Sequence, residues 1–316
     1  MKEIGGYFGL ENLISNEYYK DLIALNTGRN ALLYLLKAKN IEKLYIPYFL
    51  CDSISNILEK SKIKYVYYSI DYDFYPIFNK KLREDEYLFI VNYYGQLTDE
   101  KIISLKNKYK NIIVDNTQAF FQRPIKEIDT IYSCRKFFGV PDGAYISTDI
   151  TIDEDLDIDI SKDRMKHILG RFEGIASDYY TDFKKNDFSL KTEELKYMSK
   201  LTHNILGAIN YEEVIKLRND NFIYLHEKLK NKNKLKLIVP NAPFAYPFYM
   251  ENGITIRKKL VDQKIYIPIL WPNVLEYCPK DSIEYDYASN ILPLPCDQRY
   301  SLKDIKYMIA EVIAVG

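Results

Sequence analysis

Cysteine is scarce in this 316-residue chain, long apolar runs are missing, and neither sign of charge predominates. The four cysteines are scattered and form no C-x-x-C pair, which argues against a zinc site or a disulfide framework. No stretch approaches the roughly 20 apolar residues of a membrane span, and the start MKEIGGYFGLEN lacks the apolar run of a signal peptide. We therefore expect a cytoplasmic protein with reduced thiols, no metal site and no membrane partner.

The charge balance narrows the choice of partners further. Lys plus Arg number 44, as do Asp plus Glu, so the formal net charge is zero. No global field favours nucleic acid, whereas an enzyme that binds a small anion needs only local positive charge. With 47% hydrophobic and 28% charged residues, the composition suits a globular protein with a sizeable core, in one large or two modest domains.

Short β-rich runs alternate with helical patterns through the first half of the chain. Strands are predicted over 43–47, 63–70, 87–93, 111–115, 130–133 and 143–147, and helices over 30–39, 52–60 and 99–109. This alternation predicts an α/β fold, with a mostly parallel sheet as the middle of three layers. In such sheets ligands gather at the carboxyl ends of strands, so segments 47–51, 92–95, 115–118 and 133–136 should converge.

The second half has a different pattern. The acidic composition of 147–163 predicts a loop on the surface, and the polar segment 165–200 is predicted to be helical. A long amphipathic helix over 211–230 precedes predicted strands at 235–239, 245–249 and 264–267 and helices at 255–263 and 301–314. We expect a large domain over residues 1–209 and a smaller C-terminal α+β domain over 210–316.

Two motifs suit an anionic cofactor with a basic ring nitrogen. Gly28 directly precedes a helix, where backbone N–H groups and positive potential can bind phosphate, although an ordinary loop-to-helix turn has the same pattern. Asp115 ends a buried strand, and a buried carboxylate needs a partner such as the pyridinium nitrogen of pyridoxal phosphate (PLP). Gln118, three residues further on, can reach the ring hydroxyl. The simpler alternative for Asp115 is that its side chain caps the next turn.

The third motif is IYSCRKFFGVPDGAYIS, in which Lys136 stands between two strand-like runs. Burial and the adjacent Arg135 would favour a neutral amine, which can form an imine and later move protons. Ser133 precedes the lysine by three residues, a spacing that suits contact with the cofactor phosphate. The alternative interpretation is a surface Lys-Arg pair.

The order of these motifs resembles the DegT/StrS-type sugar aminotransferases, which have the PLP-dependent fold type I. The resemblance consists of the glycine before a helix, a strand-end proline, N-Y-Y-G, D-x-x-Q-A and S-x-x-K with trailing glycines, and of LRNDNFIYLHEKL and NILPLPCDQRY further on. It covers most of the chain, and 148–195 matches poorly. It implies Lys136 as the Schiff-base lysine and proton shuttle, Asp115 at the pyridine nitrogen, Gln118 beside the ring and Asn92 near the cofactor's edge.

The resemblance also assigns a phosphate site, formed by Gly28, Arg29 and Ser133. Departures from the family pattern are equally visible. Cys51 stands where the family has a ring-stacking aromatic residue, so stacking would fall to Phe49 or Tyr48. V-P-D-G over 140–143 replaces G-E-G-G, and the N-x-R-M segment is not recognisable near 197–199.

The function implied is amination of a nucleotide-linked keto sugar, with glutamate as amino donor and a homodimer as the working unit. Arg299 and Arg29 are candidate anion contacts. Trp271 could stack on a base or sugar, but for Trp271 and Tyr300 plain packing is the simpler interpretation. Three alternatives stay open: a PLP-binding protein that has lost transamination, a PLP-dependent sugar enzyme of another reaction type, and a protein without PLP in which Lys136 is structural.

Overall fold

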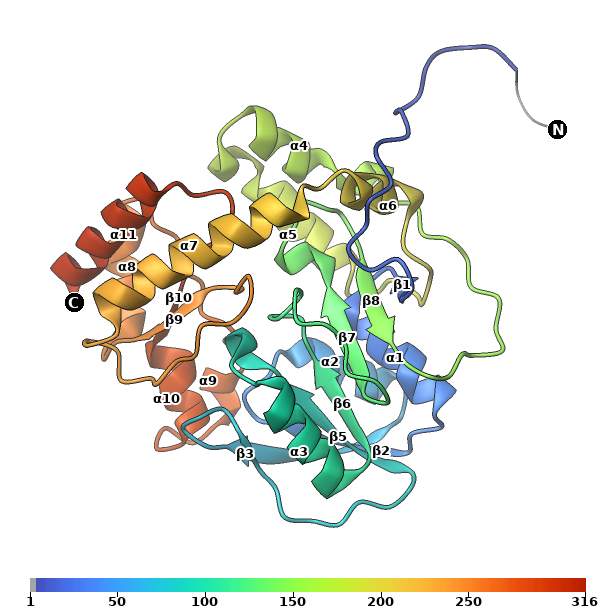
Figure 1. Ribbon diagram of the computed structural model, residues 1–316, viewed down its shortest axis with the longest axis horizontal. Helices are drawn as coiled ribbons and strands as arrows, with labels where there is room; N and C mark the ends of the chain where they lie inside the picture. Colours follow the sequence, from blue (N-terminus) through green and yellow to red (C-terminus); the bar gives the residue numbers. More distant parts are fainter. Residues whose placement is uncertain (1–3) are drawn as a thin grey trace.

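A single eight-stranded sheet forms the centre of the computed structural model, which describes residues 4–316 (Figure 1). The strand order is β1-β8-β7-β6-β5-β2-β3-β4. Strands β2, β3, β5, β6 and β7 run parallel, whereas β8 is antiparallel to both β7 and β1, and β4 is antiparallel to β3. The bounds are β1 (Ile23–Leu25), β2 (Lys43–Pro47), β3 (Lys64–Ile70), β4 (Pro76–Ile77), β5 (Glu86–Val91), β6 (Ile112–Asp115), β7 (Asp129–Ser133) and β8 (Ala144–Ser147).

Helices cover both faces of this sheet. Figure 1 shows α3 (Asp99–Tyr109) in front of the sheet, and α1 (Gly28–Ala38) and α2 (Asp52–Lys60) behind it. Since both faces are covered, the central strands are apolar throughout, and all of β6 is buried. The predicted α/β fold with a mostly parallel sheet is confirmed. Within residues 4–316, no helix is both long enough and apolar enough to cross a membrane.

Side-chain caps set where the helices begin. The Thr27 hydroxyl accepts a hydrogen bond from the Asn30 N–H, so α1 starts two residues earlier than the sequence pattern predicts. Thr98 caps α3 in the same way, through Lys101 N–H. Bounds predicted for α2 and α3 agree with the structure.

Between the sheet and the C-terminal half, the chain forms an insertion of short helices. They are α4 (Lys166–Glu173), α5 (Tyr180–Ser189) and α6 (Lys200–Gly207). The predicted helical character of 165–200 is therefore correct for most of its length. α4 and α5 pack against each other, and several of their large apolar side chains are exposed.

The C-terminal half has a core of its own around a two-stranded sheet. Long helix α7 (Tyr211–Leu229) packs on β9 and α11, and buried Phe222, Phe248 and Leu292 lie in this core. By contrast, Val274 and Tyr287 belong to the core of the large sheet. The elements after α7 are β9 (Tyr246–Tyr249), α8 (Gly253–Asp262), α9 (Val274–Tyr277), α10 (Ile283–Asn290), β10 (Ile291–Leu294) and α11 (Leu302–Val315).

Two predicted strands are wrong. Over 235–239 the backbone of Ile238 exchanges hydrogen bonds with the side chain of Gln96 instead of a neighbouring strand, and Pro240 follows. Over 264–267 the chain leaves α8 through Lys264 at φ 57° and forms no ladder. The sequence patterns there were apolar, but neither segment has a strand to pair with. Short elements β1, β4, β10, α9 and α10 were missed.

Candidate active site

The carboxyl ends of β5, β6 and β7 meet at one edge of the sheet. Asn92 N–H donates to the Asp115 carbonyl (3.0 Å), and Asn116 N–H donates to the Ile131 carbonyl (2.8 Å). The N-terminus of α1 lies beside the same loops, since a β-carbon on Gly28 would be 3.8 Å from Thr117. The structure therefore brings together a strand-end carboxylate, a helix start and the loop that follows β7.

Asp115 is a buried carboxylate with spare bonding capacity. Its Oδ1 accepts a hydrogen bond from Thr117 N–H (2.9 Å), and the Thr117 hydroxyl also stabilises the carboxylate. Burial raises the pKa of Asp115, against the Thr117 hydrogen bonds and the positive charge of Lys136. The carboxylate is therefore placed where a cationic N–H would stabilise its charged form, and Lys136 lies within electrostatic reach.

Lys136 ends η2 (Cys134–Lys136), a single turn that directly follows β7. Its side chain is exposed, so the expectation of a buried lysine is wrong for the single chain. Within the described residues its amine forms neither a hydrogen bond nor an ion pair. Its neighbours Cys134, Phe137 and Phe138 are buried, so the exposed lysine side chain stands on a backbone that is held in the core.

Two residues from the C-terminal half fix the backbone next to Lys136. The Phe137 carbonyl accepts hydrogen bonds from the Gln298 amide (2.9 Å) and from the Arg218 guanidinium (3.2 Å). Arg218 is 1% exposed, and it also donates to the Pro243 carbonyl and to Gln298 Oε1. Sequence reasoning missed both residues, although each lies in a segment that carried the family resemblance.

Aromatic rings complete this support. Phe137 and Phe138 pack into a buried cluster with Phe120, Tyr132 and Tyr145. The Arg218 guanidinium lies 4.5 Å from the centre of the Phe137 ring, a cation–π contact. Phe137 and Phe138, which follow the lysine, therefore anchor its backbone.

The V-P-D-G departure has a structural role. Asp142 is fully buried and accepts hydrogen bonds from Ser199 N–H (2.9 Å), Ser199 Oγ (2.8 Å) and Thr202 Oγ1. It thus joins the loop after Lys136 to the start of α6. Gly143 has φ +115°, a region that favours glycine, and its N–H donates to the Asn26 carbonyl (2.7 Å).

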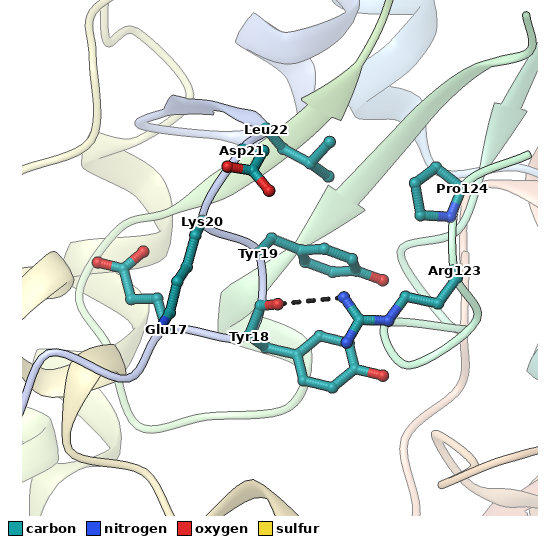
Figure 2. A pocket seen from close by; sticks show the side chains of 8 residues that line it. All are labelled: Glu17, Tyr18, Tyr19, Lys20, Asp21, Leu22, Arg123 and Pro124. Atoms are coloured by element: carbon teal, nitrogen blue, oxygen red, sulfur yellow. Dashed lines mark hydrogen bonds between the residues drawn. The ribbon is translucent and has the colours of Figure 1, made fainter. Parts of the chain in front are cut away.

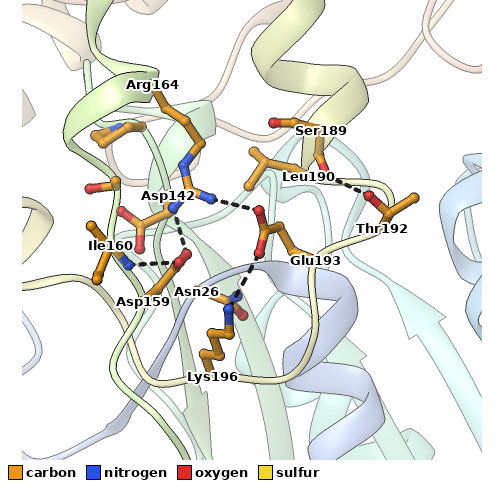
Figure 3. A network of polar contacts seen from close by, with 12 residues as sticks. Asn26, Asp142, Asp159, Ile160, Arg164, Ser189, Leu190, Thr192, Glu193 and Lys196 are labelled. Carbon is orange, nitrogen blue, oxygen red and sulfur yellow. Dashed lines mark hydrogen bonds and ion pairs between the residues drawn. The ribbon is translucent and has the colours of Figure 1, made fainter.

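Three arginines lie near one another around the start of α1, and two of them are paired with carboxylates. Arg29 donates to the Leu190 carbonyl (2.6 Å), and it forms no ion pair within the described part of the chain. Burial lowers the pKa of the Arg135 guanidinium; Asp187 opposes this, and the nearby charges of Arg29 and Arg164 add to it. Arg164 itself is neutralised by Asp159 and Glu193 (Figure 3). Arg29, beside the predicted phosphate contact Gly28, is thus the arginine of this group without a carboxylate partner in the described part of the chain, and no protein group there bonds the hydroxyl of Ser133, the third predicted contact.

Asn92 and Gln118 differ in how much bonding capacity they retain. Asn92 is fully buried: its amide donates to Asn116 and Gln122, and its Oδ1 accepts from Leu97 N–H. Every polar atom of this side chain is used, so Asn92 supports the strand end rather than a ligand. Gln118 Oε1 accepts from Tyr94 N–H (2.8 Å), and its amide N–H groups have no protein acceptor in the described region.

The predicted ring-stacking and substrate residues lie mostly in packed surroundings. Phe49 is 1% exposed and contacts the ring of Trp271 edge-on (centroids 4.6 Å apart), so both side chains pack with each other. Cys51 is half-buried at the N-cap of α2, and its thiol faces Asp52. Arg299 is held in a bidentate ion pair by Asp297, and Tyr300 packs on the C-terminal core.

Two cavities lie apart from this edge of the sheet. One, of about 440 Å³, lies between segment 17–22 and Arg123, whose guanidinium is 3.8 Å from the centre of the Tyr18 ring (Figure 2). The other, of about 370 Å³, is lined by Ile23, Ile158, Tyr197 and other mainly apolar residues. None of the predicted site residues lines either cavity.

The fold is that of the DegT/DnrJ/EryC1/StrS aminotransferases, PLP-dependent enzymes of fold type I. Such an aminotransferase from Brucella abortus superposes with a TM-score of 0.62 at 17% identity, covering 93% of this chain and 85% of that one. NtdA from Bacillus subtilis, solved with bound PMP, gives 0.64 at 18% identity, covering 95% and 73%. PseC from Helicobacter pylori, an aminotransferase of pseudoaminic acid biosynthesis, gives 0.61 at 16% identity, covering 94% and 86%. The expected fold is confirmed.

Sequence comparison adds little to this. No protein-family model matches the chain. The curated protein Ycf2 of Physcomitrium patens is 23% identical over 262 residues, which is 80% of this chain. The chain spans only 11% of the length of that protein, so the similarity carries no functional assignment.

Replacing Arg218 should destabilise the protein strongly. Arg218→Met removes a buried guanidinium that serves three acceptors, so we expect the free energy of unfolding to fall by about 3 kcal/mol. The measurement is urea unfolding followed by circular dichroism. Arg171→Met is the control, since Arg171 is exposed and has no ion pair among residues 4–316, so its loss should change stability by less than about 0.5 kcal/mol. Equal losses in the two variants would contradict the role of Arg218.

Gly143 and Gly139 form a matched pair of positions near Lys136. A β-carbon at Gly143 would lie 3.0 Å from Thr202 Cγ2 in a backbone region unfavourable to alanine, so Gly143→Ala should cost roughly 1–3 kcal/mol. At Gly139 the corresponding contact, with Ile168, is an ordinary 3.5 Å, and Gly139→Ala should change stability by less than about 0.5 kcal/mol. Urea unfolding of both variants tests the difference, which should vanish if the loop relaxes freely.

Proposed function

We propose that this chain is a PLP-dependent aminotransferase that acts on a nucleotide-linked keto sugar, with glutamate as amino donor. The observation that carries the proposal is the placement of Lys136 and Asp115: an open amine and a buried, under-bonded carboxylate at one sheet edge. The fold similarity to PseC and NtdA supports the same chemistry. We further propose a cytoplasmic homodimer that supplies an amino sugar for polysaccharide biosynthesis.

The residues present fit this cofactor. Among residues 4–316 the Asp115 carboxylate receives hydrogen bonds from Thr117 alone, so it can accept a further bond from the protonated ring nitrogen, which would lower the raised pKa of Asp115. The N–H groups of Gly28 and Arg29 at the start of α1, the Arg29 side chain and the Ser133 hydroxyl would hold the phosphate. The Gln118 amide would donate to the ring hydroxyl. Bound PLP supplies an electron sink for the carbon that exchanges its amino group.

The chain's own residues then divide the remaining work. Lys136 would hold the cofactor covalently through Nζ, and its amine would carry the proton between the two reacting carbons. Arg218 and Gln298 keep the Phe137 carbonyl in place, so the lysine backbone stays fixed while its side chain moves. The negative charge of Asp115 would keep the ring nitrogen protonated.

A second candidate is a PLP-binding protein that has lost transamination. Cys51 occupies the position of the family's stacking aromatic residue, and Phe49 packs against Trp271. A bound ring would therefore have less aromatic cover than in the family pattern. The two candidates share the cofactor and differ in the reaction that follows, so glutamate separates them.

Lys136 should be required for the visible absorption of the cofactor-loaded protein. We expect the lysine-bound cofactor to give a visible absorption band in the parent, and Lys136→Ala and Lys136→Arg to lack it. The arginine variant keeps the positive charge, so loss in both variants assigns the band to the amine itself. Lys62→Ala, at an exposed lysine, is the control and should retain the band. Identical spectra in all four proteins would exclude the Lys136 assignment.

Glutamate added to the parent protein should bleach this band as the amino group moves to the cofactor. A keto sugar linked to a nucleotide should then restore it. Loss of colour on glutamate addition supports the aminotransferase. A band that persists would instead support the non-catalytic PLP-binding protein.

Asp115→Asn should separate folding from cofactor binding. Burial holds the pKa of Asp115 above its unfolded value, so ionisation at neutral pH opposes folding, and the neutral amide should leave the cofactor-free protein equally or more stable. PLP affinity should fall roughly 10- to 100-fold, since a hydrogen bond to a charged group contributes about 1.5–3 kcal/mol. Urea unfolding and PLP titration measure the two effects. A destabilised variant with unchanged affinity would mean that Asp115 only caps the next turn.

A further inference from the structure

The N-terminal arm, residues 4–10, is an apolar segment that contacts little of its own chain. Tyr7 is 98% exposed and Phe8 is 95% exposed, and Ile4 and Leu10 are exposed as well. Figure 1 shows the arm running past α6 and away from the rest of the molecule. The sequence IGGYFGL carries no charged side chain to favour solvation. An exposed apolar segment of this kind indicates a binding partner.

The arm starts from a fixed point. Asn204 of α6 accepts from Leu13 N–H (2.7 Å) and donates to the Glu11 carbonyl (2.9 Å). Asn16 N–H donates to the Gly207 carbonyl (2.8 Å). The segment that follows the arm is therefore bound along α6, so hydrogen bonds fix the point from which the arm leaves the molecule.

The cavity of about 370 Å³ offers a surface that matches the arm. Its lining is mainly apolar, with Ile23, Ile152, Ile158, Tyr197 and Met198. Ile158 and Tyr197 are 50% and 38% exposed, so the rim is open to a large side chain. His203 also lines the cavity, and its Nδ1 lies 2.6 Å from Glu17, just after the anchored segment. The root of the arm thus lies next to the cavity, yet Tyr7 and Phe8 of the same chain remain exposed.

We propose that Tyr7 and Phe8 fill this cavity on a second copy of the chain, while the second copy's arm fills the cavity of the first. A two-fold axis makes such an exchange reciprocal, since one pair of complementary surfaces is used twice. It buries the aromatic rings and the apolar rim together. The arm and the cavity belong to the same sequence, which is why a copy of this chain is the partner.

The exchange would also support the partner's cofactor site, a point that rests on the proposed function. Tyr197 and Met198 of the cavity wall continue a segment that binds the start of α1. The Lys196 carbonyl accepts from Asn26 N–H (3.0 Å), and the Glu194 carbonyl accepts from the Asn30 amide (2.7 Å). An arm seated on this wall would hold the loop that positions the phosphate end of the site.

Sedimentation equilibrium of the cofactor-free protein tests the exchange. The parent should dimerise, and the double variant Tyr7→Ser, Phe8→Ser should dimerise at least about 100-fold more weakly, since burying one aromatic side chain contributes about 1.5–3 kcal/mol. The double variant Tyr72→Ser, Tyr266→Ser removes two exposed rings elsewhere and should leave dimerisation unchanged. A monomeric parent, or a dimer insensitive to the arm, overturns the proposal.

The cavity is tested from its own side. Ile158→Lys places a charge on the rim and should weaken the dimer as the arm variant does. A benzophenone photocrosslinker in place of Phe8 should produce a species of twice the chain mass, joined to peptides from 151–158 or 197–203 of the other copy. Crosslinks within one chain, or to α4 and α5, overturn the proposal. None of these measurements needs PLP. The arm exchange can therefore be confirmed even if the proposed function is wrong, and the proposed function can be confirmed even if the arm exchange is wrong.

Discussion

A positive and a negative charge are kept close together in this fold without forming an ion pair, and the site depends on that separation. Within residues 4–316 the Lys136 amine has no partner, although its charge reaches the Asp115 carboxylate. Asp115 is buried at the end of β6 whereas the Lys136 side chain is exposed, so the two charges lie in different surroundings. A ring that carries a basic nitrogen and an aldehyde could engage both groups at once.

Three parts of the chain that are distant in sequence maintain this arrangement. Register with β5 and β7 fixes the Asp115 backbone. Arg218 and Gln298, about 80 and 160 residues after the lysine, converge on the Phe137 carbonyl. Asp142 joins the following loop to α6. Because these supports come from both halves of the chain, loosening the C-terminal core should shift the backbone at Lys136, although neither Lys136 nor Asp115 belongs to that core.

Much of the fold was predictable from sequence because its signals are local. Thr98 and the β-branched run 112–115 specify a helix start and a buried strand without reference to distant residues. The order of Gly28, Asp115 and Lys136 was readable for the same reason. The predicted strand at 235–239 failed because a side chain, Gln96, takes the hydrogen bonds that a strand would need, and this partner lies about 140 residues away.

The roles of single side chains were harder to predict than the fold, because a role depends on which residues, often distant in sequence, lie next to the side chain. Asn92 has the chemistry of a ligand contact, yet Leu97, Asn116 and Gln122 use all of its polar atoms. Phe49 is aromatic and near the strand end, yet Trp271 packs against it. Asp142 occupied a position that looked like a loss of the family motif, and it binds Ser199, the N-cap residue of α6, and Thr202. A departure from the family's sequence pattern thus identifies a position whose contacts have changed. Only the surrounding atoms show whether the changed residue affects the reaction or the packing that holds the site.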